Sequence, residues 1–325
     1  MKKILTSIVL AALCVGFVAC DTDYEPLNMQ PAYEYSEQYY RNLRDYKSNM
    51  FERSLCFVWF SDYSDPSTPA YRFSALPDSV DICSLWGGYP AKGTIAYQEM
   101  WEMRNKKGTL LVAPTIIRIM EDKNYENFGL TYEDMVNQTT TLDPEGVYPD
   151  WCVLYGNHLL QQMWDNGIDG LDLDYEPESS DERNYGIYGE RLTLFVQYLG
   201  QFIGPEGADT TKMLIIDFYG AYPPAETEPY VNYFVKQNYG SSSCPYSSNY
   251  PNEKQVFTEN IGDYWTTGGN LEAMAADQPS TGYKGGFGAF YVQRDYHTTD
   301  SGSNNTIPYG HLRRAIQLQN PAVTK

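Results

Sequence analysis

Short, nearly continuous apolar runs alternate along the chain with longer segments in which apolar residues recur at helical spacing. Apolar runs of about four to eight residues are typical of strands that are buried on both faces, as in a parallel sheet. We predict eight strands: Ser54–Phe60, Val80–Trp86, Thr109–Pro114, Gly167–Glu176, Met213–Tyr219, Val231–Tyr239, Lys254–Glu259 and Gly285–Tyr291.

Helices are predicted between several of these strands. In Tyr155–Asn166, Leu159 and Met163 lie one helical turn apart, and Gly167 suits the left-handed conformation that ends many helices. Further helices are predicted at Tyr33–Ser48, Tyr185–Ile203 and His311–Leu318. Strands and helices that alternate in this way predict an α/β fold, a single-domain TIM (β/α)8 barrel over residues 51–325.

The first residues predict an export signal that is not part of the fold. Lys2 and Lys3 form a basic start, and the apolar run Ile4–Ala19 is too short for a comfortable membrane span. Small residues directly before Cys20 resemble the cleavage site of a bacterial lipoprotein, with Cys20 as the lipidated N-terminus. The alternative is an ordinary secretory signal that is cut nearby, and both predict an exported chain.

The segment after Cys20 is polar and reads as a tether. Its acidic residues Asp21, Asp23 and Glu25 resemble the surface-export signal of some Gram-negative lipoproteins. We therefore predict a signal peptide at 1–19, a tether and N-terminal helix at 20–50, and the barrel at 51–325. The expected location is the outer membrane, at the cell surface, through the lipid on Cys20.

Composition removes several classes of function. The net charge of −19 repels phosphate backbones, so no nucleic-acid partner is expected. With three histidines, no CxxC pair, no P-loop and no GxGxxG after a strand, neither a metal nor a cofactor is expected. Cys56 and Cys83 lie inside apolar runs, and we expect buried free thiols there in place of disulfides.

The fourth predicted strand carries acidic residues on one face. Strand side chains alternate between faces, so Asp172, Asp174 and Glu176 point into the barrel, whereas Leu171 and Leu173 face the helices. Burying carboxylates is costly unless they are paired or protonated. Crowded carboxylates raise one another's pKa, so one of them tends to hold a proton, as a general acid must near neutral pH.

The position of each acidic residue along this strand indicates its role. Glu176 comes last, at the C-terminal mouth where the active sites of such barrels form, and Asp172 and Asp174 lie deeper. Asp169 has the opposite parity and is expected to fix a loop or a helix end.

The acidic strand has two alternative interpretations. A calcium loop opens with a similar pattern, but Pro177 stands where such a loop needs glycine, and Arg183 stands at its twelfth position in place of glutamate. A solvent-exposed acidic edge is disfavoured by the flanking Leu171 and Leu173.

Asp169, Asp172, Asp174 and Glu176 match the DxxDxDxE pattern of glycoside hydrolase family 18, and the chain resembles that family. The resemblance implies a TIM barrel with this motif on strand four, which is where the strand count places it. It also implies substrate-assisted catalysis, an exception to the two-carboxylate scheme of most glycosidases. No metal or cofactor is required.

The resemblance implies a role for each matching residue. Glu176 would protonate the leaving glycosidic oxygen and later act as the base toward water. The 2-acetamido carbonyl of the GlcNAc in subsite −1 would attack its own anomeric carbon, and Asp174, backed by Asp172, would stabilise the resulting oxazolinium ion. Tyr239 would hold the acetamido oxygen, and Gln237 would line the same subsite.

The sequence defines the glycan substrate less closely than the catalytic residues. The segment Glu259–Gly285 leaves no room for the insertion that many chitinases of this family carry between strands seven and eight. Phe290 and Tyr291 stand on strand eight, where many chitinases have a tryptophan. The compact chain therefore looks more like the endo-β-N-acetylglucosaminidases, which cut between the two core GlcNAc residues of N-linked glycans.

A GlcNAc-containing glycan or glycoprotein is the expected partner. Four aromatic residues at or near strand ends are candidates for stacking on sugars, and each fits core packing equally well: Trp59, Trp86, Trp265 and Tyr291. Two alternative functions stay open, namely a chitinase or chitooligosaccharide hydrolase, and a surface glycan-binding protein without catalysis.

Overall fold

The computed structural model describes residues 35–63, 68–119, 123–177 and 186–321. The predicted signal peptide, the lipidation site Cys20 and the tether lie outside the described residues and remain predictions. The compact unit that contains all eight strands spans residues 37–325.

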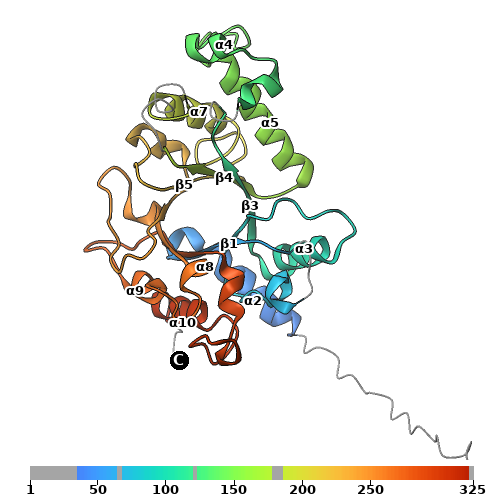
Figure 1. Ribbon diagram of the computed structural model, residues 1–325, viewed down its shortest axis with the longest axis vertical. Coiled ribbons are helices and arrows are strands. Elements are labelled where there is room, and N and C mark those ends of the chain that lie inside the picture. The colour runs from blue at the N-terminus through green and yellow to red at the C-terminus, as the bar shows by residue number, and fades with distance from the viewer. Residues whose placement is uncertain (1–34, 64–67, 120–122, 178–185, 322–325) are drawn as a thin grey trace, which may run out of the picture. The chain divides into compact units, whose positions relative to one another are not determined.

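Eight parallel strands form a closed barrel in which every strand pairs with its neighbours in sequence order (Figure 1). Pairing of the last strand with the first closes the barrel, with Leu55 opposite Gly286. The strands are β1 Leu55–Phe60, β2 Ile82–Leu85, β3 Leu110–Ile116, β4 Gly170–Tyr175, β5 Met213–Phe218, β6 Tyr233–Gln237, β7 Gln255–Asn260 and β8 Gly286–Phe290. All eight predicted strands and the TIM-barrel fold are confirmed.

The α-helices lie outside the ring of strands (Figure 1). They are α2 Glu37–Ser48, α3 Ile95–Lys107, α4 Tyr132–Asn137, α5 Asp150–Asn166, α7 Glu190–Gly200, α8 Ile261–Tyr264, α9 Leu271–Ala276 and α10 Gly310–Gln319. As predicted, α5 ends at Gly167, which adopts the left-handed conformation with φ 66°. Thr94 caps the N-terminus of α3, and its side-chain oxygen accepts a hydrogen bond from the Tyr97 amide.

Three crossovers differ from the regular alternation of strand and helix. Over the described residues, the β1–β2, β5–β6 and β6–β7 connections contain only 3-10 turns, at Pro69–Tyr71, Phe73–Ala75, Ala225–Tyr230 and Asn252–Lys254. Prolines explain the difference, because proline lacks an amide hydrogen and clashes with the preceding turn of an α-helix. Pro223, Pro224 and Pro229 stand in the β5–β6 connection, and Pro245 and Pro251 stand in the β6–β7 connection.

Strand parity divides the buried apolar residues into two layers. The inner layer fills the barrel and includes Phe57, Ile82, Val112, Ile215 and Val256. The outer layer lies between strands and helices and includes Leu171, Leu173 and Tyr175 of β4. The predicted parity of the fourth strand is therefore confirmed, and its even-numbered carboxylates point into the barrel.

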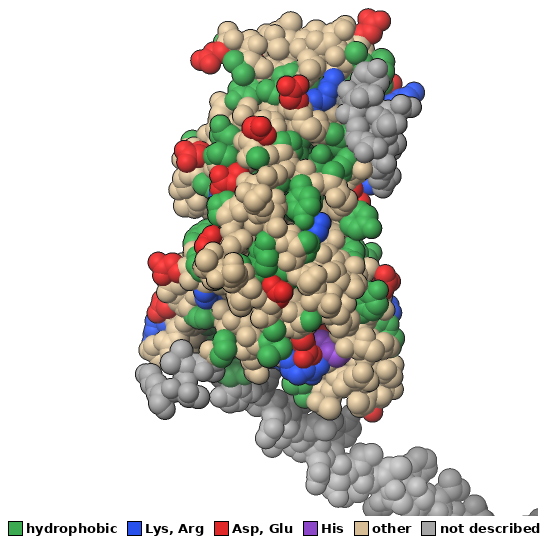
Figure 2. All heavy atoms as spheres, turned by 90° about the vertical axis from the view of Figure 1, so that its left-hand side faces the viewer, with side chains coloured by type: hydrophobic (Ala, Val, Ile, Leu, Met, Phe, Trp, Pro, Cys, Tyr) green, Lys and Arg blue, Asp and Glu red, His purple; other side chains and the backbone are tan. Residues whose placement is uncertain are grey.

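Burial and surface charge agree with the sequence pattern. Cys56 and Cys83 are buried free thiols, as expected. Figure 2 shows acidic side chains spread over one face of the molecule. Among the described helices, none combines the length and the apolar character that a membrane crossing requires.

Candidate active site

Strand β4 places Asp172 in the middle of the barrel. The side chain is fully buried, and its Oδ2 accepts hydrogen bonds from Trp59 Nε1 at 3.0 Å and Ser84 Oγ at 2.7 Å. These donors come from β1 and β2, the strands that precede β3 in the barrel. Asp172 is thus held in one orientation by two neutral donors.

Asp169, just before β4, faces the other way. Its Oδ1 lies 2.6 Å from Arg104 Nη2 in the last turn of α3, and its Oδ2 accepts a hydrogen bond from the Leu111 amide of β3 at 3.0 Å. The ion pair ties a helix end to the base of two strands. The predicted structural role of Asp169 is therefore confirmed.

Asp217 is a buried carboxyl that the sequence interpretation missed. It lies on β5 directly opposite Asp174 of β4, and Gln237 Nε2 donates to Oδ1 of both residues, at 2.9 Å for Asp217 and 3.3 Å for Asp174. A signal was available, because Asp217 is the one charged residue in the apolar run Met213–Tyr219. Asp172, Asp174 and Asp217 therefore gather deep inside the barrel, and the motif predicted the first two of them.

Burial raises the pKa of all three carboxyls, and repulsion from neighbouring carboxylates adds to the rise for Asp174 and Asp217. Burial is the main cause for Asp172, whose pKa rises to about 6, and hydrogen bonds from Ser84 and Trp59 limit the rise. For Asp174 burial comes first, and the nearby charges of Glu176 and Asp172 add to it, so its pKa reaches about 8. The pKa of Asp217 is raised well above its ordinary value by burial and by the charges of Asp174 and Asp172.

The buried carboxyls of Asp172 and Asp217 can hold a proton between them. Oδ1 of Asp172 and Oδ2 of Asp217 are buried and accept no hydrogen bond from an N–H or O–H donor of the described residues. The interaction between the two carboxyls lowers the pKa of Asp172 and raises the pKa of Asp217, which favours Asp217 as the residue that holds a proton. A proton on Asp217 satisfies both atoms and removes one of the buried negative charges.

Glu176 stands one residue beyond β4 and reaches solvent. Its side chain is 24% exposed, and its Oε2 lies 3.6 Å from Arg118 Nη2, on the segment that follows β3. Arg118 was also missed by the sequence interpretation, because nothing in its local pattern connects it with strand four. The Glu176 carboxyl is thus the most accessible of the four, because Asp172, Asp174 and Asp217 are buried.

Tyr239 extends the site from the end of β6. It is half-buried, and its ring stacks on Phe290 with the ring centres 6.0 Å apart and the planes 21° apart. Burial raises the pKa of the phenol well above its usual value, and the charges of Asp217, Asp174 and Glu176 raise it further. The hydroxyl therefore stays protonated and remains a hydrogen-bond donor close to these carboxylates.

Phe290 is the centre of an aromatic group at the mouth of the barrel. Its ring centre lies 5.9 Å from Trp59, 5.4 Å from Trp86 and 4.3 Å from Tyr291. Trp86 is half-buried and lines a cavity of about 120 Å³ with Tyr89 and Pro114, among others. Trp86, Phe290 and Tyr291 thus present apolar surface at the entrance.

Two of the four aromatic candidates do not fit the expected stacking on sugars. Trp59 is 1% exposed, so it cannot touch a sugar face, and its indole N–H orients Asp172 instead. Trp265 lies beyond α8, outside the strand ends, where it packs on the outer core and Arg294 covers its ring at 5.5 Å. The residue type alone could not reveal these positions, since both are decided by the packing of neighbouring elements.

The site combines an accessible carboxyl, buried carboxyls with raised pKa values, and a phenol and an amide that can bind a polar substituent. Within the described ranges, no cluster of three or more His, Cys, Asp or Glu side chains is arranged to hold a metal ion. A closed parallel barrel with carboxylates at the C-terminal end of β4 is the arrangement of a barrel glycosidase.

Comparison with known proteins gives the family. The profile of glycoside hydrolase family 18, BT1044-like, matches residues 21–298. The chain therefore belongs to glycoside hydrolase family 18.

Two curated relatives carry the name endo-β-N-acetylglucosaminidase. The chain is 24% identical over 327 residues to endo-β-N-acetylglucosaminidase F2 of Elizabethkingia meningoseptica, a match that covers 86% of this chain and 85% of the relative. It is 26% identical over 197 residues to EndoS of Streptococcus pyogenes serotype M1, a match that covers 57% of this chain and 19% of EndoS.

Solved structures share the fold. BT1044 superposes with a TM-score of 0.66 at 21% identity, over 88% of this chain and 93% of that one. The endo-β-N-acetylglucosaminidase of Cordyceps militaris superposes with a TM-score of 0.61 at 18% identity, over 89% of this chain and 98% of that one. At these identities the likeness shows the fold, and the activity has to be argued from the site.

Proposed function

We propose that this glycoside hydrolase is an endo-β-N-acetylglucosaminidase that cleaves the GlcNAc-β-1,4-GlcNAc core of N-linked glycans with retention of configuration. The observation that carries the proposal is the gathering of Asp174, Gln237 and Tyr239 beside the accessible Glu176. The deep groups can bind an acetamido substituent, and Glu176 can reach the glycosidic oxygen. The name of the F2 relative, which matches most of both chains, supports the choice of glycan.

The proposed reaction begins with proton transfer from Glu176 to the glycosidic oxygen. The C1–O bond breaks as the acetamido carbonyl oxygen of the same sugar attacks C1, which forms an oxazolinium ion. Asp174 accepts a hydrogen bond from the acetamido N–H, and the Tyr239 hydroxyl donates to the acetamido oxygen. Since the nucleophile belongs to the bound sugar, the attack is intramolecular and gains from proximity.

The second half of the reaction uses Glu176 as the base. It takes a proton from water, the water oxygen attacks C1, and the oxazolinium ring opens to restore the acetamido group. Asp217 keeps its proton throughout and donates it to Asp172 as a hydrogen bond. The positive charge that develops on the oxazolinium ion lowers the raised pKa of Asp174, so Asp174 faces that charge as a carboxylate. Gln237 holds Asp174 in place from the side of β6.

Two substitutions test these roles. Glu176→Gln should lower glycan release by at least about a hundredfold while glycan binding persists, because the amide keeps the shape but carries no transferable proton. Asp174→Asn should also lower turnover strongly, because it removes the charge that stabilises the oxazolinium ion. Released glycans would be measured by mass spectrometry from high-mannose and complex-type glycoproteins, with Glu102→Gln on the exposed face of α3 as the control.

The alternatives give different outcomes in the same assay. Hydrolysis of chitin oligomers without release of N-glycans would establish a chitooligosaccharide hydrolase. Glycan binding by a folded wild-type chain, without turnover on any substrate and unchanged in Glu176→Gln, would establish a glycan-binding protein. Wild-type rates in either variant would contradict the roles assigned to Glu176 and Asp174.

We further propose that the enzyme works outside the cell as a lipoprotein of the outer membrane, attached through Cys20. The support is the signal-like sequence Lys2–Ala19 and the acidic residues that follow Cys20. An anchored enzyme at the surface would act directly on glycoproteins that are too large to cross the membrane.

A further inference from the structure

The segment that follows β3 brings a cation to the carboxyl of Glu176. Arg118 Nη2 lies 3.6 Å from Glu176 Oε2, and both side chains are about three-quarters buried. A guanidinium group keeps its positive charge at every pH at which such an enzyme is assayed. It therefore acts on Glu176 throughout the reaction, although no step of the proposed reaction uses it.

The backbone on both sides of Arg118 is fixed. Ile117 and Ile119 are buried in the apolar layer between the strands and the helices. The Ile117 amide also donates a hydrogen bond to the Asp174 carbonyl at 3.2 Å, so the chain stays joined to β4 beyond the end of β3. Because both neighbours are anchored in the outer layer, the guanidinium of Arg118 is held beside the end of β4, where Glu176 stands.

Arg118 acts on two carboxyl groups at the end of β4. Burial, followed by the charges of Glu176 and Asp172, raises the pKa of Asp174 to about 8, and the charge of Arg118 opposes that rise. Tyr239 also lies near Glu176, but burial and the nearby carboxylates raise the pKa of its phenol, which therefore stays neutral. Among the described residues, a change in the charge of Glu176 thus acts chiefly on Asp174 and Arg118.

The two halves of the proposed reaction make opposite demands on Glu176. In the first half the carboxyl gives its proton to the glycosidic oxygen, and in the second half the carboxylate takes a proton from water. A nearby cation favours the carboxylate and therefore favours the second half. An ion pair of 3.6 Å between partly exposed side chains shifts this balance without keeping the carboxyl permanently ionised, so the first half can still proceed.

We propose that Arg118 is a positioning residue that holds Glu176 as a carboxylate once the glycosidic bond has broken, so that Glu176 can act as the base. This role rests on the proposed function, and Arg118 lies outside the DxxDxDxE motif. In the step concerned, a proton moves from water to Glu176, the water oxygen forms a bond with C1, and the bond between C1 and the acetamido oxygen breaks. Arg118 stabilises the negative charge of Glu176 until the proton arrives.

Hydrolysis of a sugar oxazoline isolates this step, because the substrate already contains the ring that the first half would form. The probe is the oxazoline of a GlcNAc that carries the trimannosyl group. Arg118→Met should hydrolyse it on the order of tenfold more slowly at pH 6, and the acidic limb of its pH profile for kcat should move to higher pH. The reason is that, without the cation, the Glu176 carboxylate takes up a proton more readily.

Two further variants separate charge from structure. Arg118→Lys keeps the positive charge and should keep the acidic limb close to that of the wild type. Arg41→Met removes the same charge from an exposed position on α2 and should change neither the rate nor the limb. An acidic limb that stays in place in Arg118→Met, with the wild-type melting temperature, would overturn the role of Arg118. If Arg118→Met does not fold, Arg118→Gln decides by the same measurement.

A titration separates this role from the proposed function. A folded wild type that neither hydrolyses the oxazoline nor releases glycans would contradict the proposed function. The side-chain carboxyl carbon of Glu176, assigned in NMR spectra by its loss in Glu176→Gln, should still titrate at a higher pH in Arg118→Met than in the wild type. Equal titration midpoints in the two proteins would overturn the role of Arg118 whatever the activity.

Discussion

At the residue scale, the barrel interior contains buried carboxyl side chains that its stability does not require. Asp172, Asp174 and Asp217 lie in or beside an apolar core that hydrophobic side chains could fill at lower cost. Trp59 and Ser84 neutralise part of that cost by donating to Asp172, and a proton on Asp217 neutralises more. Buried carboxyls that are retained despite this cost indicate a catalytic site, because catalysis uses their charge and their proton.

The raised pKa values predict that folding stability depends on pH. A carboxyl whose pKa is higher in the folded chain takes up a proton on folding, so stability falls as the pH rises between the two values. The pKa of Asp172 rises from 3.8 to about 6, and the pKa of Asp174 rises from 3.8 to about 8. Urea unfolding should therefore give a lower free energy of unfolding at pH 8 than at pH 5, by about 1.4 kcal/mol per pH unit for each proton concerned.

Asp217→Asn is the matched variant for this prediction. Asparagine keeps the shape and can donate to Asp172 permanently, so one buried titrating group is removed. We expect the variant to lose less stability than the wild type between pH 5 and pH 8. A pH profile steeper than that of the wild type would show that Asp217 is not the group that holds the proton.

At the element scale, single carboxylates connect several segments of the barrel through hydrogen bonds and ion pairs. Glu259 connects the segments after β6 and β7 with the start of α9, and Asp169 connects α3 with β3 and β4. The sequence showed the strands themselves, because burial on both faces leaves a continuous apolar run. It did not show these connections, because a lone glutamate at a strand end looks the same whether it meets solvent or three amides.

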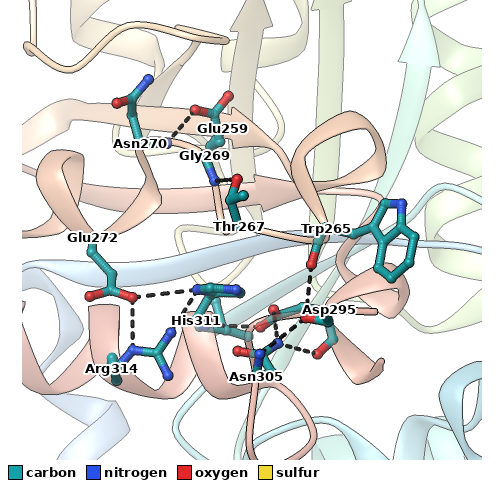
Figure 3. Close-up of polar contacts among 12 residues, drawn as sticks. Glu259, Trp265, Thr267, Gly269, Asn270, Glu272, Asp295, Asn305, His311 and Arg314 are labelled. Carbon is teal, nitrogen blue, oxygen red and sulfur yellow. Dashed lines mark hydrogen bonds and ion pairs between the residues drawn. The ribbon is translucent and has the colours of Figure 1, made fainter. Parts of the chain in front are cut away.

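Glu259→Gln tests how much one such carboxylate contributes to the free energy of unfolding. The glutamine amide group would face a backbone N–H that now donates to a carboxylate oxygen, so at least one buried hydrogen bond is lost. We expect the free energy of unfolding to fall by about 2–3 kcal/mol in denaturant titrations. Glu272→Gln is the control, because Glu272 pairs with Arg314 at the surface (Figure 3), where the two side chains are 39% and 43% exposed. We expect it to change the free energy of unfolding by less than about 1 kcal/mol. Equal effects in the two variants would contradict the anchoring role of Glu259.

At the scale of the whole molecule, the chain joins an acidic barrel to a signal-like N-terminal sequence. The barrel and its family are shown, whereas the membrane attachment remains a proposal based on residues before the described part of the chain. In a Gram-negative host fed radiolabelled palmitate, Cys20→Ser should abolish labelling of the chain, because the thiol that carries the lipid is missing. Cys14→Ser, inside the apolar run, should keep the label. Labelling that survives in Cys20→Ser would contradict the lipoprotein proposal.

The sequence by itself determined the eight strands, the fold class and the inward row Asp172, Asp174 and Glu176. It could do so because apolar runs and alternating parity are local properties, which the chain carries before it folds. The family motif then connected that row with a kind of chemistry.

Only the tertiary structure decided which groups surround the row. It brought Asp217 beside Asp174 and Arg118 beside Glu176. It also buried Trp59 and moved Trp265 away from the strand ends. The physical reason is that parity fixes the face on which a side chain lies, whereas the closure and register of the barrel fix its height and its neighbours.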